Sequence, residues 1–90
     1  MEKTYLKINR ADSVVVCLEA MKKGETVEVD GKAITLNQDT PAGHKVLIND
    51  APAGTNIIKY GYPIGHAITD LKAGDWVNEN NLKTNLKGML

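Results

Sequence analysis

One turn pattern occurs four times along these 90 residues, and it constrains the chain more than any other feature. In each copy a polar or acidic residue stands four or five positions before a glycine, and a β-branched residue stands three positions after it. The copies lie at residues 19–27, 38–46, 49–57 and 69–77. A glycine in this setting supplies the positive φ of a tight turn, and the β-branched residue begins a strand. The pattern predicts short strands joined by glycine turns.

The segments between these turns carry the period-2 alternation of strands. The alternating pairs are Leu6 and Ile8, Val27 and Val29, Ile34 and Leu36, and Val46 and Ile48. Asp30-Gly31 is a strong signal for a type I′ hairpin turn. Residues 13–23 show some helical spacing, but the β-branched run 14–16 favours a strand there. The intervals between the glycines are too uneven for a solenoid. We therefore predict one mostly β domain over residues 1–90, with little helix.

Composition and charge indicate which kinds of binding partner and which cellular compartment the sequence favours. Eleven Lys and Arg balance eleven Asp and Glu, and no block of like charge exceeds Lys22-Lys23. This balance argues against a nucleic-acid or anionic-membrane partner. No apolar run approaches the ~20 residues of a membrane span, and no signal peptide is evident. The single Cys17 is expected to be a core residue of a cytoplasmic protein. A chain this short is not expected to build a deep active site.

Strong catalytic motifs are absent from the sequence, including a P-loop, a Cys pair and a nucleophile elbow. His44 and His66 each follow a glycine, and a turn histidine most often only forms a hydrogen bond. Two histidines this far apart do not make a metal-ligand pattern. From spacing alone, neither histidine is a compelling functional residue.

The run 57–66 is richer, because Gly61 and Gly65 around a proline predict a tight loop. Such a loop would present Lys59, Tyr60 and Tyr62 to an anionic ligand. The alternative is that the tyrosines cover a small core while the Lys59 stem lies along it. The asparagine-rich run 76–85 predicts turns and caps, or amide recognition of sugar hydroxyls.

Several runs stand in one order along nearly the whole chain: residues 6–14, 41–46, 58–67, 72–74 and 81–86. Together they resemble the N-terminal SAF domain of the altronate and galactarate dehydratases. The resemblance implies a β-clip fold and a place in cytosolic hexuronate and aldarate breakdown. It also implies a hydro-lyase that depends on a divalent metal, iron or manganese, and whose catalytic body follows the SAF domain.

The sequence departs from this family at positions where many members have histidine. Asn9 replaces one such histidine, and residues 76–81 replace a His-Val-His-x-His-Asn run. The resemblance therefore carries over no metal ligand, and we expect this chain alone to bind no metal. His44 is retained, so the resemblance makes His44, Lys59 and Tyr60 the expected catalytic residues. Asn81 and Thr84 are the expected substrate-binding residues, whereas His66 lies outside the motif.

The resemblance leads to one main hypothesis and two alternatives. We expect the SAF part of an altronate-type hydro-lyase, which lends a lid or wall to a sugar-acid site carried by a catalytic domain or large subunit. His44, Lys59 and Tyr60 are expected on neighbouring loops facing that partner, and the isolated chain is expected to be inactive. The ending after residues 84–88 favours an excised domain over a separate small subunit. The alternatives are a stand-alone carbohydrate- or partner-binding module and a homo-oligomerisation domain.

Overall fold

The computed structural model describes residues 5–7 and 9–84, and within this part the chain forms nine short strands and no helix. The strands are β1 Tyr5–Leu6, β2 Val14–Cys17, β3 Thr26–Val29, β4 Lys32–Thr35, β5 Lys45–Leu47, β6 Asn56–Lys59, β7 Tyr62–Ala67, β8 Trp76–Val77 and β9 Leu82–Thr84. The mostly β prediction is confirmed. Over these residues there is also no helix that could cross a membrane.

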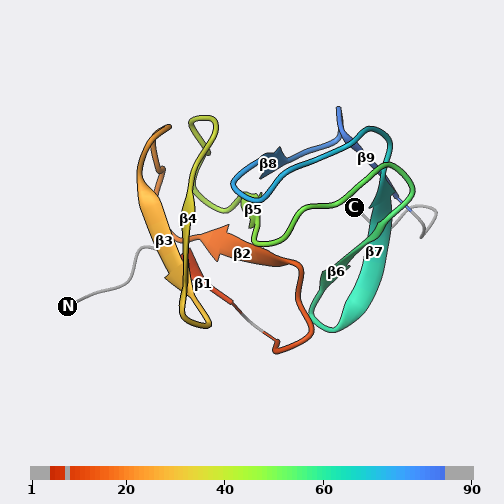
Figure 1. Ribbon diagram of the computed structural model, residues 1–90, viewed down its shortest axis with the longest axis horizontal. Helices are drawn as coiled ribbons and strands as arrows, with labels where there is room; N and C mark the ends of the chain where they lie inside the picture. Colours follow the sequence, from red (N-terminus) through yellow and green to blue (C-terminus); the bar gives the residue numbers. More distant parts are fainter. Residues whose placement is uncertain (1–4, 8, 85–90) are drawn as a thin grey trace.

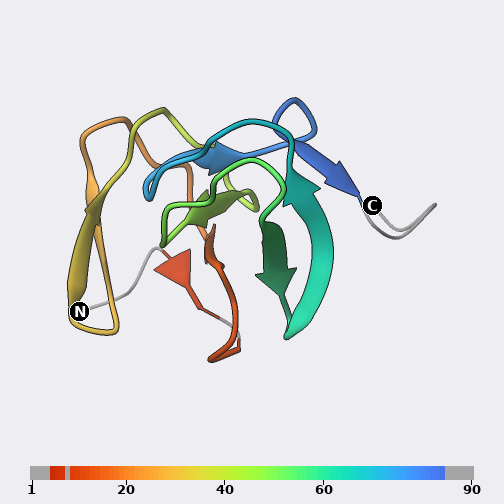
Figure 2. The ribbon, with the colours of Figure 1, turned by 45° about the vertical axis from the view of Figure 1, so that its right-hand side comes forward.

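Three antiparallel sheets are stacked across the molecule (Figure 1). The four-stranded sheet, in the order β1-β2-β5-β8, lies in the middle. The β3–β4 hairpin stands on one side of it, and the β6-β7-β9 sheet stands on the other. Figure 2 shows the same order after a 45° turn. Both faces of the central sheet are therefore covered.

This burial on both faces explains the continuous apolar run of β2. Val15 packs into the cluster shared with β3 and β4, whereas Val14 packs into the cluster shared with β6 and β7. The same division occurs on β5, where Val46 belongs to the first cluster and Leu47 to the second. Successive strand residues point to opposite faces, so the buried positions of β2 and β5 are apolar on both sides of the sheet.

The four glycine turns belong to two copies of one structural unit, a bent two-stranded ribbon that contains two of the turns. The first copy contains the β3–β4 hairpin and is closed by a bridge between Met21 and Thr40. The second contains the β6–β7 hairpin and is closed by the equivalent bridge between Ala51 and Leu71. In both, the first turn glycine donates its N–H across the ribbon, Gly24 to Leu36 at 2.9 Å and Gly54 to Ala67 at 2.7 Å. The intervals between the glycines are uneven because the first and the last each span one ribbon, whereas the middle one spans the link between the two ribbons.

The prediction of a type I′ turn at Asp30-Gly31 is confirmed by φ angles of 52° and 81°. The prediction of a loop over residues 57–66 is wrong, because this segment is a second hairpin. Its turn, Tyr60-Gly61, has φ angles of 56° and 78°. Pro63 is tolerated in β7 because it pairs only with β6, whereas β9 joins further along, from Gly65.

Candidate functional site

A hollow with a volume of about 690 Å³ lies on the surface where β5, β8 and β9 come together. It is lined by His44, Lys45, Trp76, Val77, Asn78, Glu79, Asn80, Leu82 and Lys83. Val77 is fully buried and Leu82 packs against the second core cluster, so these two residues form an apolar floor. The remaining lining is polar or aromatic and carries more cations than acids.

His44 is fixed by the turn that leads into β5. Its carbonyl accepts the N–H of Cys17 at 2.8 Å, and the N–H of Gly43 bonds the Cys17 carbonyl at 2.7 Å. The indole N–H of Trp76 donates to Nδ1 of His44 at 3.2 Å, and the two rings meet edge to face at 5.5 Å. When Nδ1 accepts a hydrogen bond, the neutral imidazole carries its proton on Nε2. His44 is exposed, so Nε2 is the nitrogen available to a ligand.

Asparagine side chains build the turn between β8 and β9. The Asn81 side chain accepts the N–H of Asn78 at 2.9 Å and donates to the Trp76 carbonyl at 2.8 Å. The Asn78 side chain in turn accepts the N–H of Asn80 at 2.9 Å. These bonds match the expectation that asparagines form turns and caps here. Asn81 thereby holds the backbone of Trp76, the partner of His44.

Lys45 is a cation of the hollow that sequence reasoning missed. It lies on β5 between Val16 of β2 and Val77 of β8, and it is half-buried. Burial lowers the pKa of Lys45, and the nearby charge of Lys59 lowers it further. The signal was the strand alternation itself, which puts Lys45 on the same face as the buried Leu47.

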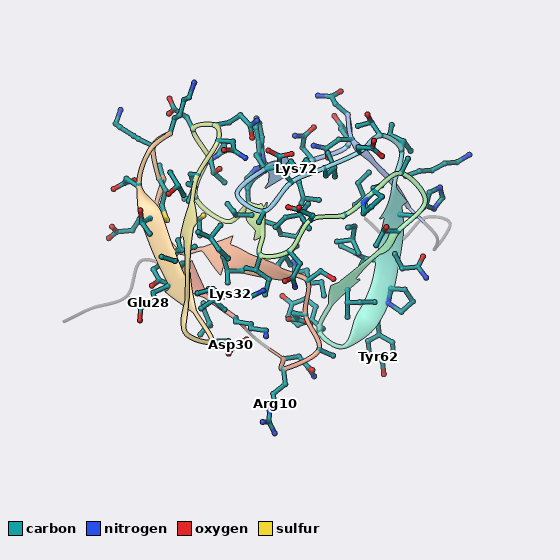
Figure 3. The ribbon with its side chains drawn as sticks, in the orientation of Figure 1. Arg10, Glu28, Asp30, Lys32, Tyr62 and Lys72 are labelled. Atoms are coloured by element: carbon teal, nitrogen blue, oxygen red, sulfur yellow. The ribbon has the colours of Figure 1, made fainter. Side chains whose placement is uncertain are left out.

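Lys59 is the last residue of β6, and Tyr60 follows it in the turn that leads to β7. Lys59 Nζ stands 4.8 Å from the centroid of the Tyr60 ring, which is a cation–π contact. The Tyr60-Gly61 turn is held by the buried Asp12, which accepts the Gly61 N–H at 2.9 Å. Figure 3 shows the exposed Tyr62 projecting from this same lower end of the molecule.

The expectation that His44, Lys59 and Tyr60 lie on neighbouring loops is wrong for Lys59, which belongs to strand β6, and stays a prediction for the relative position of the three side chains. The His44 turn contacts β2 and β8, whereas the Tyr60-Gly61 turn contacts the segment before β2. Lys59 comes near Lys45, the neighbour of His44 in sequence. Thr84 ends β9 opposite Gly65, and its side chain lies outside the described part.

The described residues do not fit the divalent metal that the resemblance implies. Within residues 5–7 and 9–84, no three His, Cys, Asp or Glu side chains come together in a way that could hold a metal ion. His66 lies on β7, and Asn9 stands against the Gly61 turn, with its amide 3.1 Å from where a Cβ of that glycine would be. No chemical step of this domain is therefore assigned to a metal.

A second, smaller hollow of about 240 Å³ lies beside the β3–β4 turn. Two of its cations are already paired, because Lys7 forms an ion pair with Asp30 at 2.7 Å and Lys32 donates to Asn49 at 3.0 Å. Figure 3 shows Lys32 and Asp30 at this lower left end, away from β8 and β9. Among the residues that the structure describes, the Lys45 ammonium forms no ion pair, so the hollow around Lys45 is the better candidate site.

The fold and the hollow define a small all-β module with an open, cation-lined surface rather than an enclosed active site. Residues 3–85 match the model of the altronate/galactarate dehydratase SAF domain. The chain belongs to this family.

Three relatives show how much of a larger protein such a domain makes up. The chain is 44% identical over 85 residues to the altronate dehydratase of Escherichia coli (strain K12), covering 94% of this chain and 17% of the relative. It is 37% identical over 84 residues to the altronate dehydratase of Bacillus subtilis (strain 168), covering 93% and 17%. It is 39% identical over 51 residues to the (2R)-sulfolactate sulfo-lyase subunit alpha of Paracoccus pantotrophus, covering 57% and 76%. The chain thus spans about a sixth of the dehydratases it matches.

Proposed function

We propose that this chain is the SAF domain of a sugar-acid hydro-lyase of the altronate dehydratase type, and that it forms one wall of an active site carried mainly by a catalytic body. The observation that carries the proposal is the match of nearly the whole chain to 17% of each dehydratase. The remaining length of those relatives is ample for a catalytic domain. The hollow is open on the surface, as a wall that a second domain completes would be.

Removing water from a sugar acid needs three things. A base takes the proton next to the carboxylate, an electropositive group stabilises the resulting negative charge, and an acid protonates the departing hydroxyl. In this proposal His44 is the catalytic residue of the domain: because Trp76 donates to Nδ1, the Nε2 N–H is presented as a hydrogen-bond donor to the negative charge that develops on the substrate, while the base and the acid belong to the catalytic body. The catalytic body holds the divalent metal, iron or manganese.

The other expected site residues take supporting parts in this proposal. Lys59 contributes positive charge, and Tyr60 holds its ammonium through the cation–π contact. Asn81 is a positioning residue, since its side chain fixes the backbone that carries Trp76. Thr84 is assigned to substrate binding on the resemblance alone.

A chimera tests the proposal. Residues of this chain would replace the matching segment of the E. coli altronate dehydratase, and formation of the 2-oxo acid from altronate would be measured. We expect the chimera to dehydrate altronate and the enzyme lacking the segment to be inactive. In the chimera, His44→Ala should lower kcat by about 10²–10³-fold with little change in melting temperature, because an exposed side chain adds little to the core.

His66→Gln in the same chimera is the matched control, since it removes the other histidine of the domain. We expect it to retain turnover. If His44→Ala lowers the melting temperature but leaves kcat unchanged, His44 has a structural role and not a catalytic one. If the chimera folds and is inactive while the domain still binds sugar acids, the chain is a stand-alone binding module.

The match to the sulfo-lyase subunit alpha favours a second arrangement of the same function. That relative is a separate subunit, and the chain covers 76% of it. A small subunit of this kind would act in trans on its catalytic partner. Adding this chain as a separate polypeptide to the shortened dehydratase distinguishes the two arrangements, because only an independent subunit restores turnover without covalent linkage.

A further inference from the structure

We propose that Lys45 anchors a carboxylate of the sugar acid in the hollow between β5, β8 and β9, with Lys59 adding positive charge from outside the lining of the hollow. This inference rests on the proposed function and deepens it, since it names the group that holds the substrate. It assigns a role to Lys45, which stands inside the family motif but was given no role from the sequence.

The first argument is that, within residues 5–7 and 9–84, neither Lys45 nor Lys59 forms an ion pair with a carboxylate. The ion pairs in the described part are Lys7 with Asp30 at 2.7 Å and Lys72 with Asp50 at 3.9 Å. Lys45 is half-buried, and its ammonium loses part of its hydration without gaining an opposite charge in return. The positive charge of Lys59 nearby adds repulsion, and burial together with this repulsion lowers the pKa of Lys45. A bound anion would remove both penalties.

The second argument is the position of Lys45 in the central sheet. Its strand neighbours Val16 and Val77 lie on the same face as Val14 and Leu47, which pack against β6. The Lys45 side chain therefore leaves the sheet on the side where β6 carries Lys59. A lysine held in a strand loses less freedom on binding than one on a loop, which makes it a suitable anchor.

The third argument is the chemistry of the hollow. Lys83 adds a further cation to the lining, against the single acid Glu79, so the hollow favours an anion. Its apolar floor, Val77 and Leu82, suits the C–H groups of a carbon chain. His44 lines the same hollow. A carboxylate at Lys45 therefore places the adjacent carbon, whose proton is removed, in the hollow that His44 borders.

Nuclear magnetic resonance of the lysine side chains in this 90-residue chain tests the inference. The ε-methylene signals would be followed during titration with galactarate, and with galactitol as the neutral polyol of matched shape. We expect galactarate to shift the Lys45 signal saturably, in the millimolar range, and to raise its pKa towards the ordinary value for lysine. Galactitol should leave the signal unchanged. Lys45→Met, which keeps the apolar stem, should abolish binding, and Lys45→Arg should retain part of it.

Lys23→Met is the matched control, because it removes one positive charge at an exposed site away from the hollow. It should bind galactarate as the unmodified chain does. Galactarate binding that survives Lys45→Met, or a Lys45 signal that galactarate does not move, overturns the inference. Failure of the proposed function gives a different result. In that case acetate and malonate shift the Lys45 signal as strongly as galactarate does, and the chimera is inactive.

Discussion

Gly43 and Gly74 offer a direct test of how the two ribbons are packed. They occupy equivalent turns, and each donates its N–H to the central sheet, Gly43 to Cys17 at 2.7 Å and Gly74 to Leu47 at 2.8 Å. Both have positive φ, 82° and 96°. A Cβ on Gly43 would meet nothing within 4 Å, whereas a Cβ on Gly74 would lie 2.1 Å from the Thr35 carbonyl oxygen. Both alanine variants therefore carry the cost of a positive φ, and only Gly74→Ala also carries a steric overlap.

Alanine in the left-handed region costs about 1–2 kcal/mol, which is the expected loss for Gly43→Ala. Gly74→Ala adds a backbone overlap that forces Thr35 to move, at about 1–3 kcal/mol more. In a domain of this size 1 kcal/mol lowers the melting temperature by about 4–8 °C. Urea and thermal unfolding of both variants measure the difference. Equal losses for the two variants would show that the close approach of Gly74 to β4 does not exist.

Three further predictions concern buried and half-buried groups. Burial raises the pKa of the Cys17 thiol, so a thiol reagent should modify the folded chain slowly at neutral pH and rapidly in urea; fast labelling of the folded chain would contradict this. At pH values between the lowered pKa of Lys45 and the ordinary lysine pKa of about 10.4, the unfolded chain binds more protons than the folded chain. The free energy of unfolding should therefore rise with pH in this range, and Lys45→Met should remove that rise. Asp12→Ala leaves the N–H groups of Asn9 and Gly61 without their acceptor and should cost about 2 kcal/mol in urea unfolding, whereas an unchanged midpoint would mean that Asp12 does not hold the hairpin turn.

The sequence was sufficient where the structure depends on local chemistry. The Asp30-Gly31 turn and the strand at β2 follow from the residues that form them, because the dihedral preferences of Asp-Gly and of β-branched residues act within a few positions. The second hairpin was missed for the same reason. Tyr60 stands where the first ribbon has Asp30, and a tyrosine with positive φ is not what turn preferences indicate. Aligning the two ribbons would have revealed it.

The site depends on contacts between distant segments, which local patterns do not encode. His44 meets Trp76 only because β5 pairs with β8, and Lys45 becomes half-buried only because β2 and β8 flank it. The family motif contained Lys45, but nothing in the sequence showed that this lysine is half-buried. Burial of a charged residue is a property of the assembled sheets, so it appeared only with the structure.

The account's central claim is that this domain completes a dehydratase site that it cannot form alone. The most direct measurement is altronate and galactarate turnover, with ferrous iron or manganese, by three samples: this chain alone, the E. coli altronate dehydratase without its matching segment, and the two joined as one polypeptide. The account predicts turnover by the joined protein only. Dehydration by the 90-residue chain alone, or equal turnover by the shortened dehydratase with and without it, would contradict the claim.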